Sequence, residues 1–417
     1  MVTSYCGLVR ILRRMNLLQR QFSFRSRLWA RWALILAGLA LAALPFVPSV
    51  DAAQAKKKTA VKKTTVAKAT VQRTAAKASA KTAPKRRVSR SPWSAPNFAD
   101  SANGDTWEGD DPDVRRAAIE ALGKLNGSVV VTDANTGRIL TVVGQKTAYK
   151  SGYQPCSTIK VPVALAALSE SLVDRLTQIR LYGNTKVAMT EALARSNNQY
   201  FASLGEKLGF ERMSYYARLY GLGEKASLNI AEERPGILPA KTPSSGMGMM
   251  TSFGDGITLT PLEYAALIGA VANGGTLYYL QYPDSQQDAD VLMPRVKRKL
   301  DIEHLVNEIK PGMMGAVEYG TARRIGYHDD LPIYGKTGTC TDTRTPTHLG
   351  WFGSFTEVGH DRIVVVVMLT GGSAMSGGSA AGVGGNVYKN LVRANYYSHE
   401  NAGAERLATL VQNVAGQ

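Results

Sequence analysis

Residues 56–92 impose the strongest limit on what this chain can fold into. They are mostly Lys, Ala, Thr and Ser, and they contain neither an acidic nor an aromatic residue. A segment of this composition cannot bury enough apolar surface to offset the entropy lost on ordering the chain. We therefore predict a disordered basic linker over 51–112, one folded domain over 113–397 and a tail over 398–417.

The positive charge of the chain belongs to the part that precedes the folded domain. The formal net charge is +17, but residues 1–95 hold 20 of the 50 Lys and Arg residues and a single acid, Asp51. Residues 96–417 then carry 30 bases and 32 acids. A nucleic-acid-binding domain would concentrate its basic residues on the folded part. We therefore expect no nucleic acid among the partners.

The first 50 residues have the pattern of a membrane-targeting segment. Residues 1–31 contain seven Arg and no acid, and Trp32–Val47 is almost wholly apolar. The positive-inside rule places the basic region 1–31 in the cytoplasm and the folded domain outside it. The long basic start favours a retained anchor over residues 32–50, whereas the small residues after Pro48 favour a cleaved signal peptide. Both interpretations stay open.

The cysteine pattern argues against a metal site. The chain has three cysteines, Cys6, Cys156 and Cys340, and no Cys-x-x-Cys pair or Cys/His cluster. Structural zinc sites need such clusters of ligands. We expect neither a metal nor a cofactor.

Strand and helix signals both occur along the predicted domain. Ile363–Leu369 is a continuous apolar run, which is typical of a strand buried on both faces. Residues 282–299 are polar and basic and predict an excursion from the core. The pattern predicts strands at 127–133, 138–143, 331–340, 347–356 and 362–370, and helices at 113–125, 186–206, 211–220, 260–271, 302–319 and 382–393.

The candidate nucleophile is Ser157, which begins the tetrapeptide Ser-x-x-Lys ahead of an apolar helical run. Residues i and i+3 share one face of a helix, so the amine of Lys160 can reach the hydroxyl of Ser157. A buried Lys loses its proton more readily and can act as a base, and the N–H groups of the helix start favour an oxyanion. The alternative interpretation is a solvated helix start, since this tetrapeptide is common.

Two further motifs carry polar side chains suited to a cleft. Ser196 and Asn198 offer a hydroxyl and a carboxamide at a helix start, where the alternative role is helix capping. The third motif closes a predicted strand and combines an amine, two hydroxyls and a glycine that allows close backbone approach. This combination favours carboxylate binding, and the alternative is an exposed hairpin turn. The third motif comprises Lys336, Thr337, Gly338 and Thr339.

The three motifs, in this order and behind an export signal, resemble the penicillin-recognising serine enzymes. The likeness covers about residues 113–395 and is closest to the transpeptidase domain of penicillin-binding proteins, in a small class B-like form. Other stretches similar to that family are GSVVVTDANTGRIL, AEERPGILP and EYGTARR. The resemblance implies an α+β fold, in which an antiparallel sheet flanked by helices lies beside an all-helical lobe, with Ser157 between them.

The resemblance also implies a role for each residue. Ser157 would attack the penultimate D-Ala carbonyl of a peptidoglycan stem peptide, and Lys160 would take its proton. Ser196 would relay a proton to the leaving D-Ala, and Asn198 would hold the substrate amide. The terminal carboxylate would bind to the third motif, and the backbone N–H groups of Ser157 and Thr339 would form the oxyanion hole.

Two cysteines depart from the family pattern. Cys156 stands where the family usually has Gly, and Cys340 stands where it usually has a small residue. Some carbapenem-hydrolysing β-lactamases carry Cys at both positions and join them. This likeness implies a disulfide between Cys156 and Cys340, which an exported domain permits; two buried free thiols are the alternative.

The expected function is that of a serine D,D-transpeptidase, acylated by β-lactam antibiotics, in the bacterial cell envelope. Its periplasmic or extracytoplasmic domain would be membrane-anchored or secreted, and a cell-wall synthesis complex is a further expected partner. Three alternatives stay open. A D,D-carboxypeptidase would use water as the acceptor, a serine β-lactamase would use Glu232 or Glu233 as a base, and a membrane-tethered sensor would bind β-lactams without turnover.

Overall fold

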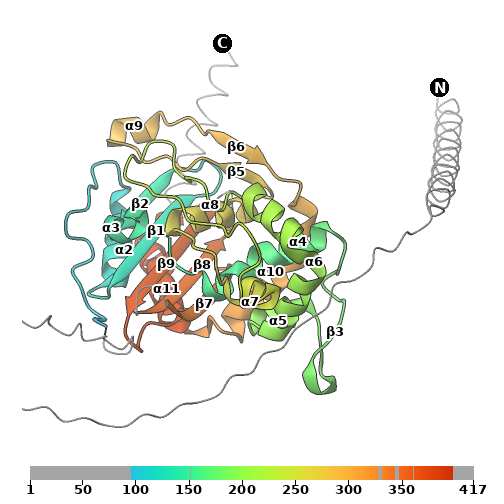
Figure 1. Cartoon of the computed structure of the whole chain (residues 1–417). Helices are drawn as coiled ribbons and strands as arrows, with labels where there is room; N and C mark the ends of the chain where they lie inside the picture. The colour runs from blue at the N-terminus through green and yellow to red at the C-terminus, as the bar shows by residue number, and fades with distance from the viewer. Residues whose placement is uncertain (1–94, 151, 327–330, 343–346, 360, 398–417) are drawn as a thin grey trace, which may run out of the picture. The chain divides into compact units, whose positions relative to one another are not determined.

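The central sheet has five antiparallel strands in the order β2-β1-β9-β8-β7. The computed structural model describes residues 95–150, 152–326, 331–342, 347–359 and 361–397. Figure 1 shows the sheet with helices packed around it, so the expected α+β fold is confirmed. The strands are β1 (Gly127–Asp133), β2 (Ile139–Val143), β7 (Ile333–Asp342), β8 (Thr347–Thr356) and β9 (Ile363–Gly371).

Strand β9 is the centre of the sheet because its apolar run is buried on both faces. Ile363 to Leu369 are all buried, as the continuous pattern predicts. Alternate residues belong to two different cores. Val365 and Val367 face the core that includes α2 (Pro112–Leu122) and α11 (Gly377–Arg393), whereas Val364 and Val366 face the core that includes α8 (Pro261–Ala272). The sheet is therefore the middle layer between two sets of helices (Figure 1).

A helical lobe packs beside the sheet. Its helix α10 contacts both α5 and strand β7, which joins the lobe to the sheet edge. The sequence predicted two helices over 186–206 and 211–220, but the break falls earlier, between α5 and α6. Helix α6 instead continues through Gly209, whose φ of 72° interrupts its regular geometry. The lobe contains α4 (Lys160–Ser169), α5 (Met189–Ala194), α6 (Asn198–Leu219), α7 (Met247–Phe253) and α10 (Glu303–Glu318).

Short elements complete the described fold. The polar excursion at 282–299 contains one helix and a strand, β6, that pairs with β5. The start of α8 has the capping box that its sequence favours, with Thr260 and Glu263 each bonding to the other's backbone. The short elements are α3 (Gln145–Lys150), α9 (Gln286–Asp290), β3 (Ile179–Arg180), β4 (Lys186–Val187), β5 (Thr276–Tyr278), β6 (Val296–Lys299), and the 3-10 turns η2 (Cys156–Ile159), η3 (Tyr182–Asn184) and η4 (Arg323–Ile325).

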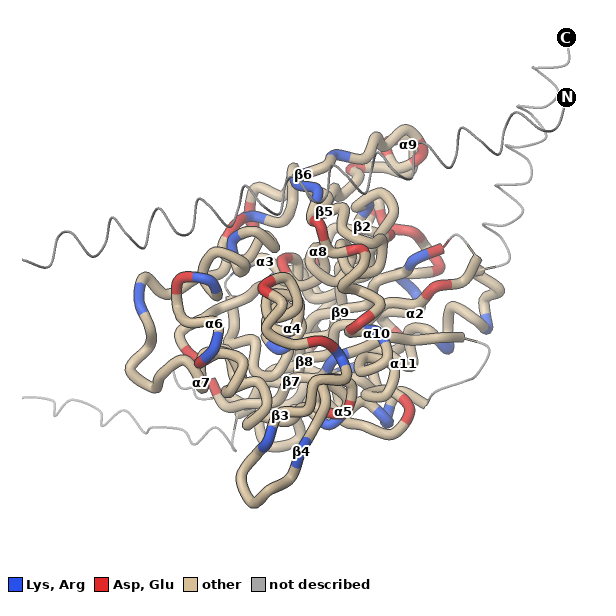
Figure 2. Tube along the Cα trace, turned by 90° about the vertical axis from the view of Figure 1, so that its right-hand side faces the viewer, with Lys and Arg blue, Asp and Glu red and all other residues tan. Residues whose placement is uncertain are grey.

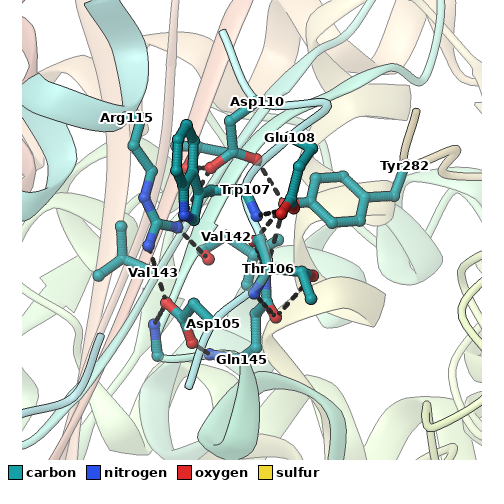
Figure 3. Close-up of polar contacts among 12 residues, drawn as sticks. Asp105, Thr106, Trp107, Glu108, Asp110, Arg115, Val142, Val143, Gln145 and Tyr282 are labelled. Carbon is teal, nitrogen blue, oxygen red and sulfur yellow. Dashed lines mark hydrogen bonds and ion pairs between the residues drawn. The ribbon is translucent and has the colours of Figure 1, made fainter. Parts of the chain in front are cut away.

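The linker prediction needs a correction at its C-terminal end, because residues 95–111 pack onto the folded domain. Arg115 of α2 pairs with Asp105 at 3.3 Å and with Asp110 at 3.1 Å, and both carboxylates point toward its guanidinium (Figure 3). Asp105 also accepts hydrogen bonds from the backbone N–H groups of Gly144 and Gln145. Asp105 and Asp110 are thus ion-pair partners of Arg115 with buried side chains. We name residues 95–111 the N-terminal strap.

The predictions for residues 1–31, 32–50, most of the linker and the tail at 398–417 lie outside the described residues. Within the part that the structure describes, no helix combines the length and apolar character needed to cross a bilayer. Lys and Arg are interspersed with Asp and Glu along this part of the chain (Figure 2), which fits the balanced charge of residues 96–417.

Candidate active site

Ser157 lies in the turn η2, directly before helix α4 begins at Lys160. Thr158 holds this turn by donating its hydroxyl to the carbonyl of Pro155 at 2.6 Å. The turn keeps the i, i+3 relation predicted from the sequence, and the Lys160 Nζ lies 2.8 Å from the Ser157 Oγ. Lys160 is fully buried and Ser157 is 9% exposed. The pair is therefore largely buried and is not a solvated helix start.

The second motif reaches the same amine from the turn between α5 and α6. The Lys160 Nζ lies 3.0 Å from the Ser196 Oγ and 2.5 Å from the Asn198 Oδ1. Neither of these residues caps the helix, because Asn197 between them accepts a hydrogen bond from the N–H of Tyr200. Ser196 has a φ of 57°, a left-handed conformation that is uncommon for a residue with a side chain. This turn directs the Ser196 hydroxyl and the Asn198 side-chain oxygen toward the Lys160 amine.

The environment of Lys160 favours its neutral form. Burial, followed by the positive charge of Lys336, lowers the Lys160 pKa to about 6. A neutral amine has two N–H groups and one lone pair. The two N–H groups can donate to the Ser196 carbonyl, 2.9 Å away, and to the Asn198 Oδ1, which leaves the lone pair facing the Ser157 hydroxyl. Lys160 is thus arranged to accept the Ser157 proton.

The third motif lies in the middle of β7 rather than at a strand end, because β7 continues to Asp342. Lys336 is fully buried, and burial lowers its pKa to about 7. Thr339 is exposed, and its Oγ1 accepts a hydrogen bond from the N–H of Gly377 at 2.7 Å. Gly338 is required for close approach, since a Cβ there would lie 2.8 Å from the Pro155 oxygen. The strand therefore packs against the turn that carries Ser157.

Cys156 and Cys340 are joined by a disulfide with a Cα–Cα distance of 5.5 Å. Cys156 directly precedes Ser157 and has a φ of 54°, in the region that favours glycine. Cys340 directly follows Thr339 on β7. The covalent bond therefore links the turn η2 to the third motif across 184 residues of sequence.

Thr321, which was not among the predicted site residues, lies between α10 and η4. Its Oγ1 forms a 2.6 Å hydrogen bond with the Oγ1 of Thr337. Thr321 belongs to the stretch EYGTARR, which lies shortly before the third motif in the sequence. This position was the one sequence signal that could have marked Thr321 as a site residue. The sequence offered no reason to select the Thr321 hydroxyl, because its partner, Thr337, lies on a different element, β7.

The two acids considered as hydrolytic bases do not join the motifs. Glu233 is fully buried and accepts hydrogen bonds at 2.8 Å from the N–H groups of Ala226 and Ser227. It also accepts one from the Ser227 hydroxyl. Glu232 is exposed. Glu233 therefore stabilises its own loop. Among the described residues, no group of three or more His, Cys, Asp or Glu side chains could hold a metal ion.

Comparison with known proteins connects this geometry to one family. The family model "Penicillin binding protein transpeptidase domain" matches residues 127–391. The chain is 28% identical over 272 residues to Stage V sporulation protein D of Bacillus subtilis, and the match covers 58% of this chain and 42% of that protein. It is 25% identical over 347 residues to peptidoglycan D,D-transpeptidase PbpA of Mycobacterium tuberculosis, covering 66% of this chain and 69% of PbpA.

Solved structures show the same fold. The crystal structure of PBPA from Mycobacterium tuberculosis superposes with a TM-score of 0.57 at 23% sequence identity, and the match covers 68% of this chain and 81% of that one. Penicillin-binding protein 2 of Pseudomonas aeruginosa, solved in complex with WCK 5153, also gives a TM-score of 0.57, at 22% identity, covering 69% of this chain and 77% of that one.

Proposed function

Because this chain belongs to the penicillin-binding protein transpeptidase family, we propose that it is a serine D,D-transpeptidase acting on peptidoglycan stem peptides that end in D-Ala-D-Ala. The observation that carries the proposal is the contact of one buried amine with two hydroxyls, since the Lys160 Nζ lies 2.8 Å from the Ser157 Oγ and 3.0 Å from the Ser196 Oγ. This arrangement can move a proton from nucleophile to leaving group. The name of the relative PbpA supports the same activity.

In the first step the Ser157 Oγ attacks the carbonyl of the penultimate D-Ala, and the neutral amine of Lys160 takes the hydroxyl proton. The N–H groups of Ser157 and Thr339 are assigned to the oxyanion that forms, an interaction worth about 3 kcal/mol for one donor in such sites. When the tetrahedral intermediate collapses, the amide C–N bond breaks. Ser196 passes the proton from Lys160 to the leaving amine, and an ester on Ser157 remains.

The third motif is assigned to the terminal carboxylate of the substrate. Lys336 supplies the positive charge, and the hydroxyls of Thr337 and Thr339 supply hydrogen bonds. Gly338 lets this strand approach the nucleophile turn closely. Asn198 is assigned to the substrate amide, and it also holds Lys160 through its side-chain oxygen.

In the second step an amine of another stem peptide attacks the ester, a new amide bond forms and Ser157 regains its proton from that amine through Lys160. A D,D-carboxypeptidase would use water in place of the amine. A β-lactamase needs a base that activates water, and the bonding of Glu233 within its own loop argues against that role. A non-catalytic sensor would not need Ser196 beside Lys160 as a proton relay.

We assign the protein to the bacterial cell envelope, with the folded domain on the outer side of the inner membrane and residues 32–50 as its anchor or signal. β-Lactam antibiotics would acylate Ser157 as substrate mimics. A relative, PBPA from Mycobacterium tuberculosis, has been solved as an imipenem acyl-enzyme complex. A cell-wall synthesis complex is the partner that this location and activity suggest.

The test combines the purified full chain with a fluorescent penicillin and, separately, with a D-Ala-D-Ala peptide and an amine acceptor. We expect a long-lived adduct on Ser157, release of D-Ala and formation of the transfer product. The Ser157→Ala variant should lose all three while its melting temperature changes little. Rapid loss of the adduct would support a β-lactamase instead, and an adduct without D-Ala release would support a sensor.

A further inference from the structure

Two phenylalanine rings from the helical lobe lie beside the amine of Lys160. The Lys160 Nζ lies 5.7 Å from the centroid of the Phe201 ring and 5.9 Å from the centroid of the Phe253 ring. Phe201 lies in α6 and is fully buried, whereas Phe253 ends α7 and is partly buried. Oxygen atoms of the first two motifs contact the same amine. The amine therefore has both polar and aromatic neighbours.

Contacts of the backbone hold Phe253 against the segment that leads to η2. The carbonyl oxygen of Phe253 accepts a hydrogen bond from the Gln154 Nε2 at 3.2 Å. Gly254 follows with a φ of 68°, and a Cβ at this position would collide with the Pro155 ring. A residue with a side chain could not make this close approach. The end of α7 is therefore held next to the turn that carries Ser157.

The packing of α6 on α7 holds Phe201 in the same way. The two helices lie side by side (Figure 1). The Thr251 Oγ1 in α7 donates a hydrogen bond to the carbonyl oxygen of Phe201 at 3.0 Å. Gly205 lies one turn further along α6, and a Cβ there would collide with the Thr251 side chain. One closely packed pair of helices thus carries both rings.

A phenyl ring beside an amine has two opposite effects. It cannot replace the hydrogen bonds of water, which disfavours the charged amine, and its π electrons attract a cation. The attraction is weak here, because both centroids lie close to the limit of about 6 Å for such contacts. Burial is accordingly the larger cause of the lowered pKa of Lys160. The positive charge of Lys336 on β7 acts in the same direction, and within the described part of the chain no acidic side chain offsets it.

On this basis, which rests on the proposed function, we propose that Phe201 and Phe253 are positioning residues that keep water from the Lys160 amine and so hold it ready to take the Ser157 proton. The two rings act through Lys160 and not on the substrate. Phe253 is the better residue for a test because it is partly exposed. Removal of the fully buried Phe201 ring would leave a cavity in the core and destabilise the fold.

The experiment compares penicillin acylation of the full chain at pH 6 and pH 8. Phe253→Ala should admit water to the amine and raise the pKa of Lys160. A rise from about 6 to about 7 would slow acylation about fivefold at pH 6 and change it little at pH 8, where the amine is mostly neutral in both proteins. Phe253→Leu, which covers the amine with an apolar group that has no π electrons, should behave as the wild type.

Phe210→Ala is the matched control, because Phe210 is another partly buried phenylalanine of the helical lobe. It should keep the wild-type ratio of the rates at pH 6 and pH 8. A Phe253→Ala variant that is slowed equally at both pH values would show only a structural role and overturn the inference. Faster acylation of this variant at pH 6 would also overturn it, because the ring would then favour the charged amine. So would a Phe253→Leu variant that is as slow as Phe253→Ala at pH 6.

The outcomes separate this inference from the proposed function. A wild-type protein that forms no adduct at either pH would overturn the proposed function together with this inference. A wild-type adduct combined with an unchanged rate ratio in Phe253→Ala would overturn the role of the ring and leave the acyl-enzyme chemistry intact.

Discussion

The sulfur of Cys156 is bonded to the sulfur of Cys340, which joins the residue before the candidate nucleophile to the residue after Thr339. The bond lies where two site segments meet. It also holds Cys156 in a left-handed conformation, with a φ of 54°. A glycine would adopt that conformation without strain, so the disulfide and a glycine are two ways to build the same turn.

Removal of this disulfide should destabilise the protein. Cys340→Ser is expected to lower the free energy of unfolding by about 2–4 kcal/mol, because it frees a closed loop in the unfolded chain. It should also slow acylation by penicillin, since the turn and β7 lose their covalent link. In the Cys340→Ser background, Cys156→Gly should be more stable than Cys156→Ala by about 1 kcal/mol. Denaturant unfolding would measure both, and equal stability of the two variants would argue against strain at position 156.

Acylation should depend on the protonation of Lys160. Its pKa is lowered to about 6, and only the neutral amine can take the Ser157 proton. The second-order rate of penicillin acylation should therefore rise as pH increases through about 6 and fall again above about 7, where Lys336 loses the charge assigned to the substrate carboxylate. Stopped-flow measurements between pH 4.5 and 8 would follow this rise. A rate that is flat across the range, or a Lys160→Ala variant that reacts at the wild-type rate, would show that Lys160 is not the base.

The ion pairs of the N-terminal strap should become more important as pH rises. Burial raises the pKa of Asp110 to about 6 and also raises that of Asp105. Below pH 5 Asp110 is protonated, so loss of its cationic partner costs little. Above pH 7 Arg115→Met leaves buried carboxylate charge without a partner, and the loss of stability should reach about 3 kcal/mol.

Thermal unfolding of this variant at pH 5 and pH 8 would measure the difference. Arg116→Gln is the control, because Arg116 pairs with Asp113 on the exposed face of the same helix. The Arg116→Gln change should shift the free energy of unfolding by about 0.5 kcal/mol or less at both pH 5 and pH 8. A loss for Arg115→Met that is equal at pH 5 and pH 8 would contradict the proposed role of carboxylate ionisation.

Glu233 should affect stability and not the lifetime of the acyl-enzyme. In Glu233→Gln an amide N–H₂ group replaces one of the two oxygens that now accept hydrogen bonds from backbone N–H groups. One of these N–H groups then faces another donor, so we expect the free energy of unfolding to fall by about 1–3 kcal/mol. The half-life of the penicillin adduct should match that of the wild type. A markedly longer half-life in the variant would mean that Glu233 activates water, and would favour the β-lactamase alternative.

The sequence alone determined the features that depend on neighbouring residues. The i, i+3 relation of Ser157 and Lys160, the capping box of α8 and the burial of β9 follow from spacing and apolar pattern, and the structure has all three. Motif order was sufficient to recognise the family, because each motif is a short local pattern. The disulfide was expected from that resemblance and not from the residues themselves.

Tertiary structure decided which distant groups share an environment. Asp105 and Asp110 of the strap, which was predicted as linker, find their partner Arg115 only when α2 packs on the sheet. The break before Asn198 and the contact of Thr321 with Thr337 likewise depend on long-range packing. The lowered pKa of Lys160 needs burial by several elements and a second lysine 176 positions along the chain. Local sequence sets which conformations are available, but burial and charge proximity arise only when remote segments pack together.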